Sequence, residues 1–506
     1  MNYTVSGKGS YLLVPVWAGE EEKAIKITVD GGSEMMIMLP IASSDKKPSY
    51  SAPVAVVCAG SCAQEHTAVL SADVDLKEVI SQFVFSDDVP EPETQKCRPL
   101  CHFAAKTGWI NDPNGMVFKD GVYHLYFQYN PFNTKWENMC WGHAESRDLL
   151  HWEQKDTVLF PSENAHIFSG SGIQNNHSLL NLPESALVFF YTYAAPRTAK
   201  SEAERAFSQK IAYSTDSGRT FQKMEGDFLP TICADNRDPK VFYHSPTQAY
   251  ICVLWLEKST YALFRSTDLK QWRETQRISL EPAWECPDLF ELECGETHEK
   301  KWVFWSADGY YWVGNFDGYR FEAEQDMQKA YLTKLPYAAQ TFSGLSERVV
   351  SIAWLRTENR AQLFRGVMSL PRCFSLVKKG SQYLLSQRAA EQWYASLKKI
   401  FSRQFSGSTS FSSESAAYLI DMDFGSEDAE YTVSYGGKML FSSAVFGNRG
   451  GKKHIQLFID GCVAELTNSD CTAIAHFELD AAEGESAVVA LESSGKCGAT
   501  LYSVGN

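Results

Sequence analysis

The stretch W-I-N-D-P-N-G, residues 109–115, stands shortly before the alternating apolar run V-Y-H-L-Y-F-Q-Y, residues 122–129. Asn, Asp, Pro and Gly are the residues that turns use, so local turn chemistry is one explanation of the stretch. The run that follows it is the first of five strongly apolar, β-prone runs, which begin at residues 122, 186, 249, 302 and 349. A spacing of roughly 50 to 60 residues indicates an array of similar units.

A second repeat supports the first. It consists of a short acidic turn followed by an aromatic residue, and it occurs as S-R-D-L-L-H-W from 146, S-T-D-S-G-R-T-F from 214 and S-T-D-L-K-Q-W from 266, with F-D-G-Y-R-F from 316 as a shorter form. Each Asp is expected to close a turn on its own backbone, while the aromatic side chain packs inward. Four-stranded blades of about 50 residues fit this pattern. The sequence therefore predicts an all-β fold with a five-bladed β-propeller over residues 101–375; a large β-sandwich is the alternative.

The segments outside the propeller are predicted from shorter patterns. Alternating apolar runs indicate a small N-terminal β domain at residues 1–88, followed by a Pro-rich and charged linker at 89–100. A connecting segment with a short helix is expected at 376–400, and a C-terminal β-sandwich at 401–506. The role of the N-terminal domain stays open between a packing or dimerisation module and a further glycan-binding surface.

Composition excludes several classes of partner. The formal net charge of -15 argues against nucleic acids, which require a basic surface, and favours a neutral substrate. No run approaches the roughly 20 apolar residues of a membrane helix. The first residues lack the pattern of a signal peptide, so a cytoplasmic location is expected, or a secreted one if a leader was removed. A homo-oligomer remains possible.

The chain has 13 cysteines, an odd number without the paired spacing of a disulfide framework, which indicates reduced thiols. Two C-x-x-x-C pairs, Cys58 with Cys62 and Cys97 with Cys101, raise the question of a metal site. Zinc sites usually have tighter C-x-x-C pairs at regular distance. The expectation is therefore that the protein binds no metal and uses no cofactor.

Three acids occupy similar positions in the chain. Asp112 in W-I-N-D-P-N-G, Asp238 in N-R-D-P-K-V-F-Y and Glu285 in W-E-C-P-D-L-F each lie just before a predicted strand and are followed by proline at the next position or the one after it. Proline restricts the local backbone and so fixes the direction of the carboxylate. A propeller gathers such strand ends around one axis. Although each acid alone is more simply a turn or capping carboxylate, the set of three points to the carboxylate pair that glycoside hydrolysis requires.

The neighbours of the three acids predict different roles. Glu285 is flanked by Trp284, Cys286 and Pro287, and burial against these apolar neighbours would favour its protonated form, which suits a proton donor. Asp112 lies between amide side chains and should remain ionised, as a nucleophile must. Asp238 follows Arg237 and should also remain ionised, which suits binding of sugar hydroxyls.

Aromatic residues make up 13% of the chain. Trp109, Trp136 and Trp141 are close to the first acid in sequence, and tryptophan rings stack on the apolar faces of sugars. Packing in the protein core is an equally good explanation for each of them.

Over residues 101–373 the chain resembles glycoside hydrolase family 32, the β-fructosidases that include invertases, levanases and inulinases. The resemblance rests on motifs that occur in the family's order: W-I-N-D-P-N-G, Y-F-Q-Y-N-P, W-G-H-A-E-S-R-D-L-L-H-W, F-S-G-S, R-D-P, W-E-C-P-D-L-F, Y-A-A-Q-T-F and R-G-V-M-S-L-P-R. It implies a five-bladed propeller followed by a β-sandwich, retention of the anomeric configuration, and no metal.

The resemblance also implies a role for individual residues. Asp112 is then the nucleophile that forms a fructosyl-enzyme intermediate, Glu285 the acid/base, and Asp238 the stabiliser of the transition state. The residues expected to bind the substrate are Asn111, Gln128, Trp136, Phe168, Ser169 and Arg237, with Trp141 as an additional stacking residue.

The implied activity is hydrolysis of terminal β-D-fructofuranosyl residues from sucrose, fructo-oligosaccharides or fructans. A fructosyltransferase would use the same intermediate with a sugar as acceptor. A non-catalytic fructan-binding protein and an inverting propeller that cleaves pentosans are the remaining alternatives; inversion would require a wider separation of the two carboxyl groups.

Overall fold

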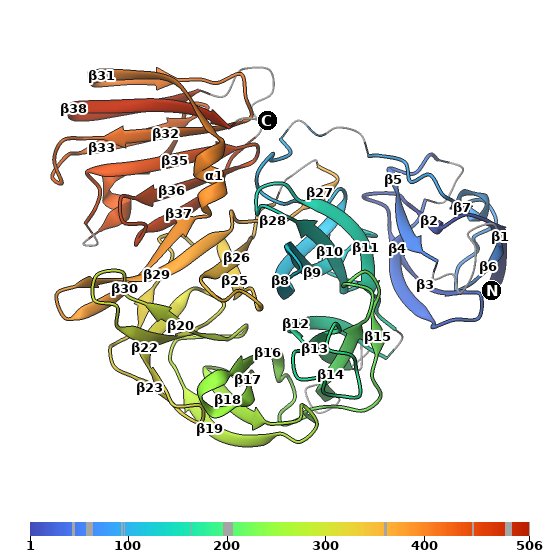
Figure 1. The fold of residues 1–506 in the computed structure, drawn as a ribbon. Coiled ribbons are helices and arrows are strands. Elements are labelled where there is room, and N and C mark those ends of the chain that lie inside the picture. The colour runs from blue at the N-terminus through green and yellow to red at the C-terminus, as the bar shows by residue number, and fades with distance from the viewer. Residues whose placement is uncertain are drawn as a thin grey trace.

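The computed structural model in Figure 1 describes residues 1–42, 46–56, 64–92, 95, 97–162, 164–195, 206–358, 362–447, 450–480 and 488–504. Within this part the regular structure is almost entirely β-strand. Figure 1 shows three bodies: a small one formed by the N-terminal strands, a central ring of sheets, and a stack of C-terminal strands on the other side of the ring.

The central ring consists of five sheets, in each of which the strands follow one another in chain order. The blades are β8–β11 (Gly108–Lys119, Val122–Asn130, Cys140–Ser146, Glu153–Leu159), β12–β15 (His166–Gln174, Leu187–Ala195, Ala206–Ser214, Gln222–Lys223), β16–β19 (Arg237–His244, Ala249–Glu257, Thr260–Ser266, Arg273–Ser279), β20–β23 (Asp288–Glu293, Lys300–Trp305, Tyr310–Phe316, Phe321–Ala323) with β24 (Gln328–Lys329), and β25, β26, β29 and β30 (Pro336–Thr341, Val349–Leu355, Arg372–Lys379, Gln382–Ala389) with β28 (Val367–Met368). The first strands β8 and β12, β12 and β16, and β25 and β8 contact one another. The five-bladed propeller is thus confirmed.

The last blade extends further than the sequence predicted. Strand β30 pairs with β29 along its whole length, so the fifth sheet ends at Ala389 and not at residue 375. The short strand β27 (Phe364–Arg365) pairs in parallel with the start of β8 and so joins the last blade to the first. Of the segment predicted to connect the domains, only α1 (Glu391–Ser396) is helical.

The predicted acidic turns at Asp148, Asp216 and Asp268 form, and each lies between the third and fourth strands of its blade. In the first blade the Ser146 hydroxyl accepts hydrogen bonds from the backbone N–H groups of Asp148 and Leu149, and the Asp148 carboxylate accepts those of Leu150 and His151. Equivalent turns form at Asp216 and Asp268. These local bonds repeat because each turn carries its own donors and acceptors.

The C-terminal strands form a β-sandwich in which β38 (Val489–Val504) belongs to both layers. One half of β38 pairs with β33 (Tyr431–Tyr435) and the other half with β32 (Ala417–Asp423), while β31 (Leu397–Phe411) follows its other edge. The remaining strands are β34 (Lys438–Ser442), β35 (His454–Asp460), β36 (Val463–Asn468) and β37 (Ile474–Glu478). Apolar side chains of these strands fill one core.

The N-terminal residues form the small separate β domain that the sequence predicted. Its two sheets have the orders β1-β6-β3-β4 and β5-β2-β7. The strands are β1 (Asn2–Lys8), β2 (Tyr11–Val16), β3 (Glu22–Val29), β4 (Met35–Pro40), β5 (Tyr50–Ala55), β6 (Glu65–Ala72) and β7 (Val84–Ser86). They enclose a core that includes Trp17, Ile25 and Ile37. Strand β4 is an edge strand, and its free edge faces the propeller.

Cys97 and Cys101 are both buried and form no disulfide. The pair Cys58 and Cys62 lies outside the described residues. None of the helices that the structure describes is long and apolar enough to cross a membrane.

Candidate active site

The first strands of the blades surround a cavity of about 540 Å³. All but one of the candidate site residues line this cavity: Asn111, Asp112, Gln128, Trp136, Phe168, Ser169, Arg237, Asp238 and Glu285. These residues come from four blades and span more than 170 positions of the sequence, yet they meet at one place. The exception is Trp141.

Four of the first strands break register at the cavity. The pairing shifts in β8 between Ile110 and Pro113, in β12 between Ile167 and Gly170, in β16 between Arg237 and Lys240, and in β25 between Tyr337 and Gln340. A break of this kind releases residues from the ladder and redirects their side chains. The side chains that lie within the breaks include those of Asp112, Ser169 and Asp238, so the breaks turn these groups toward the cavity.

Asp112 is held by donors on both carboxylate oxygens. The Ser169 hydroxyl donates to Oδ2 at 2.6 Å, and the Asn111 side-chain amide donates to Oδ1 at 3.2 Å. The Trp109 indole N–H in turn donates to Asn111 Oδ1 at 2.9 Å and fixes that amide. Two of the residues that hold Asp112 thus precede it in the opening stretch, and the third comes from the next blade.

Asp238 has a backbone conformation that is unusual for an aspartate, with φ of 64°. Its N–H donates to the Thr192 hydroxyl at 3.0 Å, and its Oδ2 accepts from the Cys286 N–H at 3.1 Å. Cys286 and Ala338 at the same site also have positive φ, at 50° and 51°. Each such residue costs of order 1–3 kcal/mol, a strain that folded proteins often keep at functional sites.

Glu285 lies just before β20 and is bound by two donors. Arg237 donates to Oε2 from Nε at 2.7 Å and also from Nη2, and the Tyr337 hydroxyl donates to Oε1 at 2.7 Å. Of the expected apolar neighbours, Trp284 does not cover the carboxylate, because it is 42% exposed and packs on Trp255, whereas Cys286 is buried. The position of Glu285 is set by a guanidinium group and a phenol.

The electrostatics of the two aspartates also differ from the expectation. Burial, and next the charge of Glu285, raises the pKa of Asp112, although hydrogen bonds from Ser169 oppose the shift. For Asp238 the same two causes raise the pKa to about 7. Arg237 lowers it only in part, because its guanidinium is bonded to Glu285 and Nε lies 3.9 Å from the Asp238 carboxylate. Asp238 is therefore partly protonated near neutral pH.

Because of this shift, Asp238→Asn should stabilise the protein at pH 8. The pKa of Asp238 is raised from 3.8 to about 7 on folding, so the ionised carboxylate destabilises the fold. This cost is absent below about pH 4, grows between pH 4 and 7 and is complete above pH 7. Its upper limit is about 4 kcal/mol, at about 1.4 kcal/mol for each pKa unit. Thermal unfolding at pH 4 and pH 8 measures the difference.

The variant should have a higher Tm than the native protein at pH 8 and an equal Tm at pH 4. The control is Asp120→Asn, an exposed position with φ of 50° that asparagine tolerates equally well. A decrease in Tm of Asp238→Asn at pH 8 would show that the carboxylate, even when ionised, stabilises the site.

The predicted tryptophans occupy three different environments. Trp136 lies at the mouth of the cavity, 48% exposed, with its ring 5.9 Å from that of Phe168. Trp141 is fully buried in the core between the first two blades, and its indole N–H donates to the Phe168 carbonyl at 3.0 Å. The prediction that Trp141 contacts the substrate is therefore wrong: it supports the wall of the cavity from behind.

Other cavity residues were not identified from the sequence. They are Glu137, His166, Ala194, Phe207, Asp235, Tyr337 and Trp354. Tyr337 begins the motif Y-A-A-Q-T-F, and Asp235 lies two residues before Arg237, so the motifs marked their neighbourhood. The contacts that matter, such as the bond of Tyr337 to Glu285, join different blades, and no local pattern encodes them.

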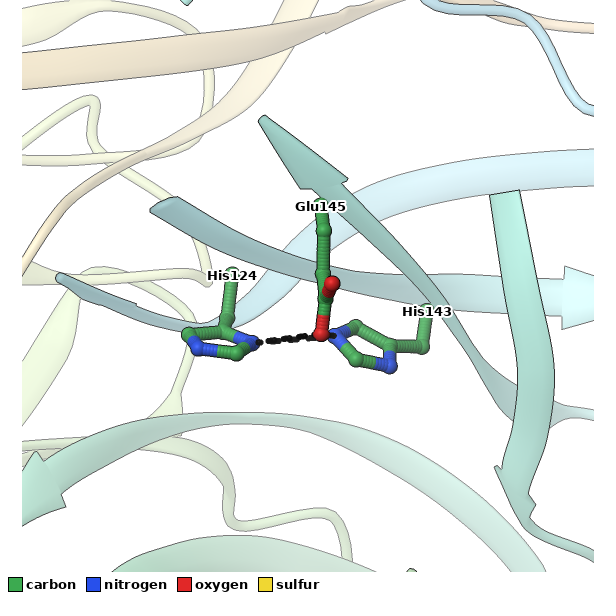
Figure 2. A group of neighbouring side chains, drawn as sticks. All are labelled: His124, His143 and Glu145. Atoms are coloured by element: carbon green, nitrogen blue, oxygen red, sulfur yellow. Dashed lines mark hydrogen bonds and ion pairs between the residues drawn. The ribbon is translucent and has the colours of Figure 1, made fainter. Parts of the chain in front are cut away.

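Outside the cavity, two histidines and an acid point toward one another (Figure 2). His124 Nδ1 lies 3.2 Å from His143 Nε2 and 3.5 Å from Glu145 Oε1, and the latter two atoms are 3.8 Å apart. A tetrahedral zinc ion with bonds of about 2.0–2.1 Å has ligands about 3.4 Å apart. The spacing alone would thus admit a divalent cation.

The surroundings of the group oppose a metal. A cation on His143 Nε2 would require the proton on Nδ1, and this buried nitrogen has no acceptor among the described residues. The Lys155 ammonium lies 3.7 Å from the Glu145 carboxylate. Burial lowers the pKa of His124 to about 4 and that of His143 well below its ordinary value, so both rings are neutral and can share one hydrogen bond. We therefore assign no metal to this group.

Comparison with known proteins identifies similar sequences and folds. Residues 102–388 match the model of the glycosyl hydrolases family 32 N-terminal domain. The chain is 36% identical over 300 residues to a levanase of Bacillus subtilis, covering 54% of this chain and 43% of that protein, and 32% identical over 334 residues to an invertase of Debaryomyces hansenii, covering 60% of each. It is also 32% identical over 399 residues to an extracellular exo-inulinase of Aspergillus awamori, covering 67% of this chain and 74% of that protein.

The crystal structure of exo-inulinase from Aspergillus awamori has the same fold, with a TM-score of 0.71, 24% sequence identity, and coverage of 81% of this chain and 99% of that chain. The chain thus spans less than two thirds of the levanase and of the invertase, but most of the exo-inulinase.

Proposed function

The chain belongs to glycosyl hydrolase family 32, and we propose that it is a retaining exo-β-fructosidase that hydrolyses terminal β-D-fructofuranosyl residues of sucrose or fructo-oligosaccharides. One observation supports the proposal above the others. Asp112, Asp238 and Glu285 line a single cavity, and each carboxylate is held there by donors from a neighbouring blade.

Asp112 is the proposed nucleophile. The donors from Ser169 and Asn111 hold its carboxylate, and one of its oxygens attacks the anomeric carbon of the fructosyl group. The bond to the leaving oxygen breaks as Glu285 gives that oxygen a proton, and the sugar remains bonded to Asp112. Glu285, now ionised, takes a proton from water, whose oxygen attacks the anomeric carbon and releases fructose and the free Asp112 carboxylate.

Asp238 is proposed to bind sugar hydroxyls. Its raised pKa means that it carries a proton for part of the time near neutral pH when no substrate is bound. Hydroxyl groups that donate to Asp238 would favour its ionised form.

The cavity favours a neutral substrate. Besides the three central acids, the cavity is lined by the acidic side chains of Glu137 and Asp235. The basic side chains in the lining are His166 and Arg237, and Arg237 is already bonded to Glu285. A phosphorylated sugar would bring two negative charges into this surrounding. We therefore propose sucrose and neutral fructo-oligosaccharides as substrates, in preference to sucrose 6-phosphate.

Release of fructose from sucrose, sucrose 6-phosphate, a short inulin series and a short levan series tests the proposal. The neutral compounds should be hydrolysed. The kcat/KM for sucrose 6-phosphate should be lower than that for sucrose by a factor of about ten or more. Absence of fructose from every compound would reject the hydrolase. A preference for the phosphate would reject only the charge argument. More glucose than fructose at high sucrose would identify transfer to a sugar acceptor.

The compartment is also part of the proposal. The eleven described cysteines are free thiols, which fits the reducing cytoplasm. The relative from Aspergillus awamori is named extracellular, so fractionation of the native cells is the direct measurement.

A further inference from the structure

We propose that the N-terminal domain positions part of the active site. It fixes the segment of residues 131–138, and this segment places Trp136 at the mouth of the cavity. This inference rests on the proposed function for its kinetic consequence, but the contacts that support it are independent of the substrate. The segment connects β9 to β10 in the first blade and contains no strand. Trp136 and Glu137 in this segment line the cavity.

The first attachment is hydrophobic. Phe132 belongs by sequence to the propeller, yet its side chain is fully buried in the core of the N-terminal domain, together with Trp17 and Leu39. Burial of one phenylalanine side chain contributes roughly 1.5–3 kcal/mol. Beside it, the Asn133 side chain donates a hydrogen bond to the Glu22 carboxylate of β3. The start of the segment is therefore packed into a domain that contributes no side chain to the cavity lining.

The second attachment is at the end of the segment and is polar. The Met38 N–H donates to Asn138 Oδ1 at 2.7 Å, and Asn138 Nδ2 donates to the Met38 carbonyl at 2.9 Å. The Asn138 side chain thus pairs with the free edge of β4 as a neighbouring strand would. Nδ2 also donates to Asn130 Oδ1 at 3.1 Å, which connects both ends of the segment to β9. Asn138 is fully buried and has φ of 51°, so it is fixed in one conformation.

Trp136 lies between these two attachments and has few contacts of its own. Its ring is about half exposed and contacts the edges of His166 and Phe168, with centroids 5.4 and 5.9 Å apart. Glu137 Oε1 lies 3.3 Å from His166 Nε2. Ordering one residue costs about 1–2 kcal/mol of conformational entropy. The attachments to the N-terminal domain offset this loss of entropy in the free protein. Without them, part of the free energy of substrate binding would be used to order the segment.

The edge of β4 offers a selective variant and a matched control. The N–H groups of Met36 and Met38 both point out of the sheet, toward the propeller, and neither takes part in the β3–β4 ladder. The Met38 N–H bonds to Asn138, whereas the Met36 N–H bonds to the Pro161 carbonyl, two residues beyond the outermost strand of the first blade. Proline is tolerated at an edge strand and removes only this donor.

Met38→Pro should raise KM for sucrose roughly 3- to 10-fold, the effect of one lost hydrogen bond, with kcat changed less than twofold. Met36→Pro should leave both constants unchanged while lowering Tm by a similar amount. Asn138→Gly, which keeps the positive φ but removes the side chain, should raise KM further. Equal KM values for the two proline variants, or a change in kcat alone, would overturn the inference.

Hydrogen exchange of the amides in residues 131–138, without substrate, separates this inference from the proposed function. Exchange should become faster in Met38→Pro than in Met36→Pro. Unchanged exchange in both would overturn the role of the N-terminal domain even if fructose is released. Faster exchange in a protein that releases no fructose would confirm the attachment and reject the proposed substrate.

Discussion

Asp112→Asn should lower kcat for fructose release by about 10⁴-fold or more while the protein remains folded. The reason is the loss of the attacking oxygen, since a neutral amide does not form the fructosyl-enzyme intermediate. Loss of a nucleophile in other hydrolases has effects of this size. The fold should persist because Asn is isosteric with Asp and can still accept the hydrogen bond that Ser169 donates. Steady-state kinetics with sucrose and circular dichroism provide the two measurements.

A matched control lies directly after β8, the strand that carries Asp112. Asp120→Asn makes the same chemical change in the exposed turn that follows β8, at a φ of 50° that suits asparagine. It should retain full activity. Turnover by Asp112→Asn within tenfold of the native protein would remove Asp112 from the mechanism, and the nucleophile would then have to be sought among the other acids of the cavity.

The parts of this fold that could be predicted from sequence are those with local causes. The turn at Asp148 closes on its own backbone and therefore leaves a motif in the chain. The apolar runs at regular spacing likewise gave the number of blades, because each buried strand needs its own run. The end of the last blade was missed because β30, residues 382–389, is recognised only through its pairing with β29.

In the candidate site, too, the features with a local cause could be predicted from sequence and the others could not. The three acids were identified by their flanking prolines and motifs, and the structure brings them together at one cavity. The bonds between the acids and their partners were not predicted, since adjacency in sequence was misleading in two cases. Arg237 donates hydrogen bonds to Glu285 and not to Asp238, and Trp284 packs on Trp255 and does not cover Glu285. Register breaks depend on how two strands pair. They leave no signal in either strand alone, and they decide where the side chains point.

Glu285→Gln should lower kcat/KM for sucrose by about 10³-fold, within the range that general acid catalysis usually contributes. The substitution is compatible with the fold, because Gln Oε1 can accept from Arg237 while its amide group faces the Tyr337 oxygen. The loss should depend on the leaving group. Sucrose needs a proton on its departing oxygen, whereas a nitrophenyl β-fructoside departs as a stable anion.

Both substrates should therefore be measured with both variants. For Glu285→Gln the decrease in the rate of nitrophenol release should be at least tenfold smaller than the decrease for sucrose. For Asp112→Asn the two decreases should be equal, since every leaving group needs the nucleophile. Equal decreases for Glu285→Gln would show that this residue acts through its negative charge or its bond to Arg237. The proton donor would then be sought at Asp238, whose pKa of about 7 keeps it partly protonated near neutral pH.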